Sequence, residues 1–299
     1  VVTGSEEENF YLYGNSIQAL EPITPINEAS FNYVHADNEG LFFITNLEAN
    51  NYRLVKISFS DFQMTEVVAE QDFALKGASF VQDYLIADYI DHADISSEIK
   101  FFDHSGNKLD LQLPKSLKGT IGGFQSMGDN SIMFSVHSYT QPIQYFTYNL
   151  TKDLLELVWE EKIPGFNPDD YVEISTHYES KDGTMVPITY SHKSSIKLDK
   201  NTPIFLYAYG GYNISIRPAF TPKYVAWLEM GGVLAVANIR GGGEFGKTWH
   251  NAGRLDTKQN VFDDFLYASK FLENNSIGNR KSTVISGRSN GGLLVGTTL

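Results

Sequence analysis

The sequence predicts an all-β unit followed by an α/β unit, and three observations support this division. Residues 1–165 contain short segments rich in Phe, Tyr, Ile and Val, with turn residues between them. Residues 166–299 alternate short apolar segments with patterns of helical spacing. The charge changes as well. The first part has 9 Lys/Arg and 24 Asp/Glu, a net charge of −15, and the second part has 14 Lys/Arg and 12 Asp/Glu, a net charge of +2. We therefore place a domain boundary near residue 165, in a stretch that contains Pro164 and Pro168.

The first part of the chain consists of strand candidates in close succession. Several of them alternate apolar with polar residues, which is typical of strands with one buried face. Turn-forming pairs such as Asn50-Asn51 separate them. The candidates are residues 40–46, 52–59, 78–90, 99–106, 131–138 and 143–150. Strands at this regular spacing predict either a β-sandwich or the blades of a β-propeller, and the lack of a simple repeat signature leaves both open.

The second part begins with a β-hairpin and continues with alternating strands and helices. The hairpin spans residues 171–193 and turns at Asp182-Gly183. Short apolar strands that alternate with helices predict a mostly parallel sheet with helices on both faces. We expect strands at 202–211, 233–238 and 282–286, and helices at 222–232, 260–275 and 291–299.

Composition and charge exclude several classes of protein. The sequence has no cysteine, so it has neither a disulfide framework nor a thiolate nucleophile. No apolar run reaches the roughly 18 residues that a membrane span needs, and an acidic first part repels phosphate backbones, so we expect no membrane or nucleic-acid partner. No group of His, Asp and Glu has the spacing of metal ligands, and we expect neither a metal nor another cofactor. The lack of a visible secretory signal favours a cytoplasmic location.

A nucleotide site is the first alternative for the glycine-rich segments. Gly241, Gly243 and Gly246 match the dinucleotide-binding pattern G-x-G-x-x-G after a predicted strand. That fold requires a helix that begins at the third glycine. The polar sequence that follows, KTWHNAGRLDTKQN, predicts no helix there, so we reject this interpretation.

Ser289 is the candidate nucleophile. Gly287, Ser289 and Gly291 match G-x-S-x-G between a predicted strand and a predicted helix, which is the setting that a nucleophile turn requires. Such a turn holds the serine in strained backbone angles. It also brings the residues two positions away against the crossing backbone, which predicts that both positions require glycine. The N-terminus of the following helix favours the negative charge of an oxyanion.

An acyl-transfer site also needs an oxyanion hole. We expect one donor to be the backbone N–H of Asn290, the residue after the serine. The second donor comes from a loop after an earlier strand, and the sequence YAYGGYN occupies that place. The phenol of Tyr209 could donate from this loop, and an ordinary aromatic residue at a strand end is the alternative.

Several segments of the second part together resemble the prolyl oligopeptidase family of serine peptidases: YAYGGYNIS, MGGVLAVANIRGGGEFGKTWH, KQNVFDDF and GRSNGGLLVGT. The resemblance covers residues 166–299 by motif and extends weakly into the first part through NYRLVKISF and YNLTKDLLE. It implies that residues 1–165 are late blades of a partial β-propeller, and that residues 166–299 are part of an α/β-hydrolase domain. It also implies an endopeptidase that cleaves short peptides on the carboxyl side of proline through an acyl-enzyme.

The resemblance implies a role for each matching residue. Ser289 would be the nucleophile, and the oxyanion would be bound by the backbone N–H of Asn290 and the hydroxyl of Tyr209. Tyr212 would line the pocket for the substrate proline, where the family usually has phenylalanine. Arg288 departs from the prolyl enzymes, which usually have glycine there, and is more similar to oligopeptidase B, which cleaves after basic residues. That activity and a non-catalytic peptide-binding relative are the alternatives.

The serine still needs a histidine base and an aspartate, which follow it along the chain in α/β-hydrolases. Only ten residues follow Ser289 and none is Asp or His, so we expect both groups beyond Leu299. We therefore interpret the chain as an internal fragment that is inactive alone. We expect the seven histidines to be structural, and Asp263 and Asp264 to lie on the polar face of a helix. The intact enzyme is expected to be a monomer that binds short proline-containing peptides.

Overall fold

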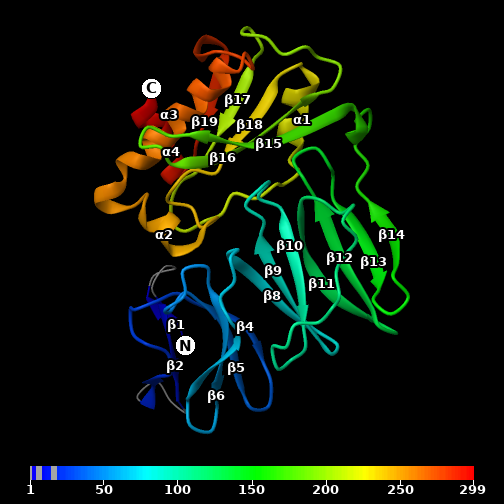
Figure 1. Cartoon of the computed structure of the whole chain (residues 1–299), viewed down its shortest axis with the longest axis vertical. Helices are drawn as coiled ribbons and strands as arrows, with labels where there is room; N and C mark the ends of the chain where they lie inside the picture. The colour runs from blue at the N-terminus through cyan, green and yellow to red at the C-terminus, as the bar shows by residue number, and fades with distance from the viewer. Residues whose placement is uncertain (1, 5–8, 15–18) are drawn as a thin grey trace.

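The structure is a computed structural model that describes residues 2–4, 9–14 and 19–299. Within these residues the strands form five sheets. Four sheets lie in the N-terminal half of the chain, and the fifth is the central sheet of the C-terminal half (Figure 1). The first is a small antiparallel sheet of β1 (Val2–Gly4), β2 (Asn9–Tyr13) and β3 (Glu21–Pro22).

Three larger antiparallel sheets follow, and in each the strands are hydrogen-bonded in chain order. Figure 1 shows them one beside the next, in blue, cyan and green. The first of them contains β4 (Phe31–Ala36), β5 (Gly40–Thr45), β6 (Arg53–Ser58) and β7 (Met64–Val68). The second contains β8 (Leu75–Val81), β9 (Tyr84–Ile90) and β10 (Ser97–Phe102). The third contains β11 (Thr120–Gly128), β12 (Ser131–His137), β13 (Gln144–Asn149) and β14 (Leu154–Glu160).

The middle sheet of the three packs against the sheets on both of its sides. In β9, Leu85 and Tyr89 join a buried cluster with Leu54 of β6. Ile86, in the same strand, joins a different buried cluster with Phe134 of β12. Because successive side chains of a strand point to opposite faces, each face of this sheet is covered by one neighbour. Sheets stacked in series in this way are propeller blades, and a two-layer sandwich does not produce them.

The single strand expected over residues 78–90 is wrong, because the structure has two strands there. They are joined at Gln82, which adopts a left-handed φ of +54° although it is neither glycine nor asparagine. The side-chain amide of Gln82 donates hydrogen bonds of 2.9 Å to Ser126 Oγ and to Ser131 O of the next blade. Tertiary contacts therefore stabilise this turn. The sequence analysis also missed strands with weak apolar patterns, of which β14 is largely exposed.

The central sheet has the order β15-β16-β18-β17-β19. Its strands are β15 (Tyr171–Glu179), β16 (Met185–Lys193), β17 (Ile204–Tyr207), β18 (Val233–Ala237) and β19 (Thr283–Ser286). β17 is parallel to β18 and to β19, whereas β15 and β16 form an antiparallel hairpin beside them. The helices are α1 (Pro222–Glu229), α2 (Gly246–Asn251), α3 (Gln259–Asn274) and α4 (Asn290–Thr298). The hairpin and the mostly parallel arrangement beyond it are as predicted.

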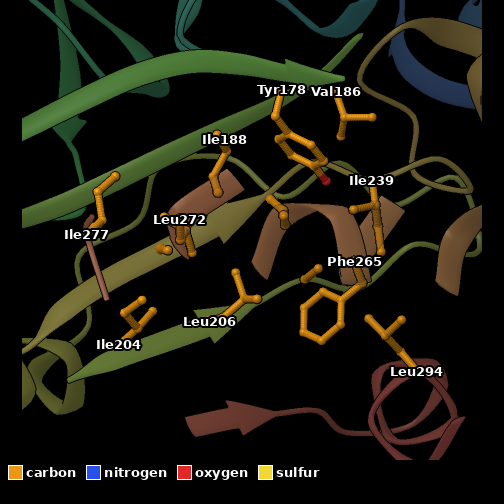
Figure 2. Packing of buried hydrophobic residues seen from close by; sticks show 14 of the residues in the cluster. Tyr178, Val186, Ile188, Ile204, Leu206, Ile239, Phe265, Leu272, Ile277 and Leu294 are labelled. Carbon is orange, nitrogen blue, oxygen red and sulfur yellow. The ribbon is translucent and has the colours of Figure 1, made fainter. Parts of the chain in front are cut away.

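Helices cover both faces of the central sheet because its strands are apolar on both sides. Leu206 of β17 packs in one buried cluster with Phe265 of α3 and Leu294 of α4, as Figure 2 shows. The next residue along the strand, Tyr207, packs in a second cluster with Tyr224 of α1. The two clusters fix α3 and α4 on one face and α1 on the other.

The prediction that no helix begins at Gly246 is wrong, since α2 begins there. The backbone N–H of Lys247 donates to Asn50 O at 2.9 Å, and that of Thr248 donates to Asn50 Oδ1 at 2.7 Å. The cap is therefore supplied by a propeller residue about 200 positions away, and local sequence does not reveal it. Asn50 also occupies the N-terminus that a pyrophosphate would need.

A second contact between the propeller and the C-terminal half of the chain is an ion pair. Arg217, in the segment between β17 and α1, donates to both carboxylate oxygens of Asp88, at 2.6 and 3.1 Å. It also donates to Ser97 Oγ at 2.5 Å. Both ionic side chains are about 15% exposed, so the pair is shielded from solvent. The segment after β17 is thus held by the propeller.

The expectation that Asp264 lies on a polar helix face is wrong. Asp264 of α3 is fully buried, and its Oδ1 lies 2.6 Å from Nη2 of Arg240. Ser180 Oγ donates to the same carboxylate at 2.5 Å. Arg240 also pairs with Asp182 in the hairpin turn, at 2.5 Å, and this hydrogen bonding holds the pKa of Asp182 well below its usual range. The two ion pairs of Arg240 therefore tie α3 and the hairpin to the segment after β18.

We predict that Asp264→Ala lowers the free energy of unfolding by about 3 kcal/mol or more, because it leaves part of a buried guanidinium uncompensated. Asp263→Ala is the matched control. Its partner Lys181 is 60% exposed, so the expected loss is about 1 kcal/mol or less. Urea unfolding followed by tryptophan fluorescence measures both variants, and equal losses would contradict the assignment.

Candidate active site

The site lies where two neighbouring parallel strands end. At the carboxyl ends of β17 and β19, Tyr207 is the register partner of Ser286. The segments that follow the two strands therefore leave the sheet side by side. One of them carries Tyr209, and the other carries Ser289. Parallel α/β sheets form their ligand sites at this edge.

Ser289 has the strained backbone that its motif predicts. Its φ of +58° and ψ of −124° lie in a region that residues other than glycine rarely adopt. Such a conformation costs about 1–3 kcal/mol and persists only where the surroundings hold it. The residue stands directly before the first residue of α4 and is exposed to solvent. The hydroxyl of Ser289 is therefore presented outside the sheet, next to a helix N-terminus.

The two glycines of the motif differ in what they permit. A Cβ on Gly287 would lie 1.9 Å from the carbonyl oxygen of Gly291, so only glycine fits. A Cβ on Gly291 would lie 3.6 Å from Ala208 O and from Tyr209 Cδ2, which is ordinary van der Waals contact. The expectation that both positions require glycine is right at Gly287 and wrong at Gly291. The backbone crosses closely on one side of the turn only.

The side chain of Asn290 joins the serine turn to the neighbouring loop. Its Nδ2 donates to Tyr209 O at 2.6 Å and to Gly210 O at 3.0 Å. A Cβ on Gly211 would lie 2.5 Å from the same Nδ2, so the loop backbone passes directly against this amide. Gly210 has a φ of +60°, and a Cβ there would meet Val261 Cγ1 at 2.6 Å. Both glycines are thus required for the close approach of the loop.

Tyr212 lies further along the same loop, on a segment that contacts the propeller. It is 57% exposed and has a left-handed φ of +54°, as does Asn213, with a φ of +57°. The Asn213 side-chain amide donates a hydrogen bond to the hydroxyl of Tyr52, which lies just before β6. The structure thus places an exposed aromatic ring close to where the propeller meets the C-terminal half of the chain.

Lys258 is a residue of this site that the sequence analysis did not single out. Its Nζ donates to Gly210 O at 2.8 Å and to Asn290 Oδ1 at 3.1 Å. It belongs to the KQNVFDDF segment that carried part of the family resemblance, and that was the only available signal. No local pattern indicates which backbone carbonyl a lysine will reach.

The seven histidines lie on other elements. The rings of His35, His92 and His104 pack against phenylalanines in or beside the propeller. His137 is in β12, and His177 and His192 are in the β15–β16 hairpin. His250 is 4% exposed, and its Nδ1 lies 2.7 Å from Gly241 O. Each has a place in packing or in a strand, and none stands in the segments beside Ser289.

Two ionisable side chains, Lys76 and Glu244, lie close to the loop that carries Tyr212. Lys76 extends from the propeller, and a Cβ on Gly243 would lie 2.6 Å from its Nζ. Burial lowers the pKa of Lys76 to about 8, although Glu244 attracts its charge. Glu244 is 1% exposed and accepts from the Ile216 N–H at 2.8 Å. Burial raises the pKa of this carboxyl group.

Taken together, a serine on a strained strand-to-helix turn beside a glycine-rich loop defines the class of α/β serine hydrolases, here joined to propeller blades. A family model described as the prolyl oligopeptidase family matches residues 218–299. A second model, described as the prolyl oligopeptidase N-terminal beta-propeller domain, matches residues 2–161. The chain belongs to the prolyl oligopeptidase family, in which a β-propeller precedes a serine peptidase domain.

Curated relatives agree with this assignment. The chain is 38% identical over 283 residues to the prolyl endopeptidase of Elizabethkingia miricola, covering 93% of this chain and 39% of that protein. It is 31% identical over 315 residues to the prolyl endopeptidase of Dictyostelium discoideum, covering 97% of this chain and 41% of that protein. The chain thus spans about two fifths of the length of these relatives.

Solved structures of prolyl peptidases are similar to this fold. One, from a study of two prolyl endopeptidases and their inter-domain dynamics, has a TM-score of 0.87 and 33% identity, covering 98% of this chain and 44% of that chain. Another is prolyl oligopeptidase B from Galerina marginata, bound to a 35mer hydrolysis and macrocyclization substrate. It also has a TM-score of 0.87, with 28% identity, and the match covers 98% of this chain and 43% of that chain. Among the described residues, no helix is long and apolar enough to cross a membrane, and no group of three or more His, Cys, Asp or Glu side chains could hold a metal ion.

We predict that alanine substitutions at the two glycines of the serine motif change the free energy of unfolding by different amounts. Gly287→Ala forces the crossing backbone apart and lowers the free energy of unfolding by about 1–3 kcal/mol. Gly291→Ala fits the available space and lies in the first turn of α4, so it changes stability by less than about 1 kcal/mol. Urea unfolding of the two variants tests this. A larger loss at Gly291 than at Gly287 would contradict the geometry.

We also predict a pH dependence of stability from Lys76. Because its pKa is lower in the folded than in the unfolded chain, the unfolded chain binds more protons between about pH 8 and pH 10.5. The free energy of unfolding of the wild type, measured relative to Lys76→Met, therefore rises between pH 7.5 and pH 10 by roughly 1–2 kcal/mol. Urea titrations at both pH values give this difference. A difference that is flat, or falls, would show that Lys76 is not held with a lowered pKa.

Proposed function

We propose that this chain is part of a serine endopeptidase that hydrolyses short peptides on the carboxyl side of proline through an acyl-enzyme. The observation that carries the proposal is the backbone of Ser289, which is strained, exposed and adjacent to the Tyr209 loop. Strain of this kind is typical of residues held for a function. Family membership and the names of the relatives support peptide hydrolysis, and the prolyl specificity is taken from those names.

The proposed mechanism assigns one task to each group. Ser289 Oγ attacks the carbonyl carbon of the scissile bond, and its proton passes to a base. The developing oxyanion is bound by the backbone N–H of Asn290 and by the hydroxyl of Tyr209, a residue whose backbone carbonyl accepts a hydrogen bond from Asn290 Nδ2. The intermediate collapses to an acyl-enzyme as the base gives this proton to the leaving amine, and water then hydrolyses the acyl-enzyme to free the acid. Tyr212 lines the pocket for the substrate proline.

We propose that the histidine base and its aspartate follow Leu299 in the intact protein. Two findings support this: the chain spans 39% of a prolyl endopeptidase relative, and its own histidines lie on other elements. The 299-residue chain alone is therefore inactive, because a serine without its base loses several orders of magnitude in rate. We also propose that residues 1–165 are late propeller blades, and that residues 166–299 are a partial hydrolase domain.

The propeller favours short peptides as substrates. Its residues Asn50, Tyr52 and Asp88 contact the loops around the site, so an extended polypeptide would have to pass between two attached units. The Galerina relative was solved bound to a 35mer hydrolysis and macrocyclization substrate. We propose a cytoplasmic monomer that needs no cofactor.

Cleavage after basic residues is the second candidate activity. The exposed Arg288 beside Ser289 is the observation that favours it, since this residue is more similar to oligopeptidase B. Relatives named prolyl endopeptidases at 38% and 37% identity favour the prolyl activity. Matched fluorogenic peptides that end in proline or in arginine distinguish the two.

We predict that Ser289→Ala in the intact protein abolishes labelling by a fluorophosphonate and lowers kcat by about 10⁴-fold or more. Tyr209→Phe removes one oxyanion donor and lowers kcat by about 10²–10³-fold with little change in KM. Tyr145→Phe, which removes the hydroxyl of an exposed tyrosine on β13, is the control and keeps kcat within about threefold, since it loses no transition-state hydrogen bond.

Labelling and hydrolysis decide between the proposals. An intact wild-type protein that neither reacts with the fluorophosphonate nor cleaves either peptide would support a non-catalytic peptide-binding relative. Faster cleavage of the arginine peptide would overturn the prolyl specificity alone. Full peptidase turnover by the 299-residue chain would overturn the proposal that the base lies beyond Leu299.

A further inference from the structure

Lys258 stands where three segments of the site meet. It immediately precedes α3, and its ammonium group reaches the loop after β17 and the first turn of α4. One donor goes to the backbone carbonyl of Gly210 at 2.8 Å, and another goes to Asn290 Oδ1 at 3.1 Å. The lysine therefore contacts both segments that carry the proposed oxyanion donors.

Asn290 completes a closed hydrogen-bond network with this lysine. While its Oδ1 accepts from Lys258, its Nδ2 donates to Tyr209 O at 2.6 Å and to Gly210 O at 3.0 Å. Gly210 O thus accepts from both side chains. An amide held at both ends keeps one orientation, so the loop is held at a fixed distance from α4.

The charged ammonium group of Lys258 is bound by two neutral oxygens, the backbone carbonyl of Gly210 and the side-chain carbonyl of Asn290. No ion pair joins Lys258 to a carboxylate in the part of the chain that the structure describes. The side chain is half-buried, and burial lowers its pKa. A cation away from bulk water polarises the amide that it binds, and this strengthens the bonds from Asn290 to the loop. A lysine needed only for solubility would extend into solvent instead.

We propose that Lys258 is a positioning residue of the site: it fixes the Tyr209–Gly211 loop against α4 and thereby sets the spacing of the two oxyanion donors. It acts through Asn290 and Gly210. The kinetic consequence rests on the proposed peptidase function, and the structural consequence does not. The experiment below therefore has one readout for each.

In the intact protein, Lys258→Met keeps the apolar stem and removes the ammonium group. We expect kcat to fall by about 10–100-fold with KM within about threefold, because small misplacements of catalytic groups cost rate and leave ground-state binding intact. Lys258→Arg, which keeps the charge and the donors, should recover part of the loss. Lys281→Met, an exposed lysine in the same part of the chain, is the control and should leave kcat unchanged.

A double-mutant cycle tests whether Lys258 acts through Asn290. Asn290→Ala removes the bridging amide and keeps the backbone N–H, so it should lower kcat on its own. If the two residues work as one unit, the double variant is no slower than the slower single variant. Multiplied losses in kcat would show independent roles and would overturn the proposal.

Hydrogen exchange supplies the readout that does not depend on activity. In Lys258→Met, peptides covering residues 205–216 and 286–295 should exchange at least several-fold faster than in the wild type, with the β15–β16 hairpin unchanged. Unchanged exchange at both segments would overturn the positioning role even in an inactive protein. An inactive wild type with the expected exchange changes would instead defeat the proposed function and leave the positioning role supported.

Discussion

The backbone of Ser289 is the constraint on which the rest of the site depends. A residue with φ of +58° and ψ of −124° is stable only where its neighbours leave no alternative. Gly287 lets the carbonyl of Gly291 pass where a side chain would collide, and Asn290 ties the first turn of the helix to the next loop. The strained geometry is therefore maintained by packing on one side and by hydrogen bonds on the other.

The parallel sheet explains why these parts meet at all. The register of β17 with β19 brings Tyr207 level with Ser286, so that the two following segments begin side by side. Alternation along β17 and β18 then fixes the helices, since odd and even residues bury against opposite layers. The Tyr209 loop and the serine turn are thus neighbours because of strand order, although about 80 residues separate them.

The propeller takes part in building the hydrolase loops. Asn50 caps α2, Tyr52 accepts a hydrogen bond from Asn213, and Asp88 pairs with Arg217. Each contact holds a segment after β17 or β18, close to the edge of the sheet where the site lies. Movement of the propeller relative to the sheet would therefore disturb the segments next to Ser289 and Tyr209.

The sequence by itself determined the class of both units, the serine turn and its partner loop, because strand and helix periods and glycine spacing are local properties. Partners distant in the chain decided the rest. Gln82 adopts its turn conformation because its side-chain amide donates a hydrogen bond to the next blade. Lys258 belongs to the site because its ammonium group binds the oxygens of Gly210 and Asn290. Asp263 and Asp264 are adjacent and chemically identical, yet only the second is fully buried, because Arg240 packs against it from 24 residues away.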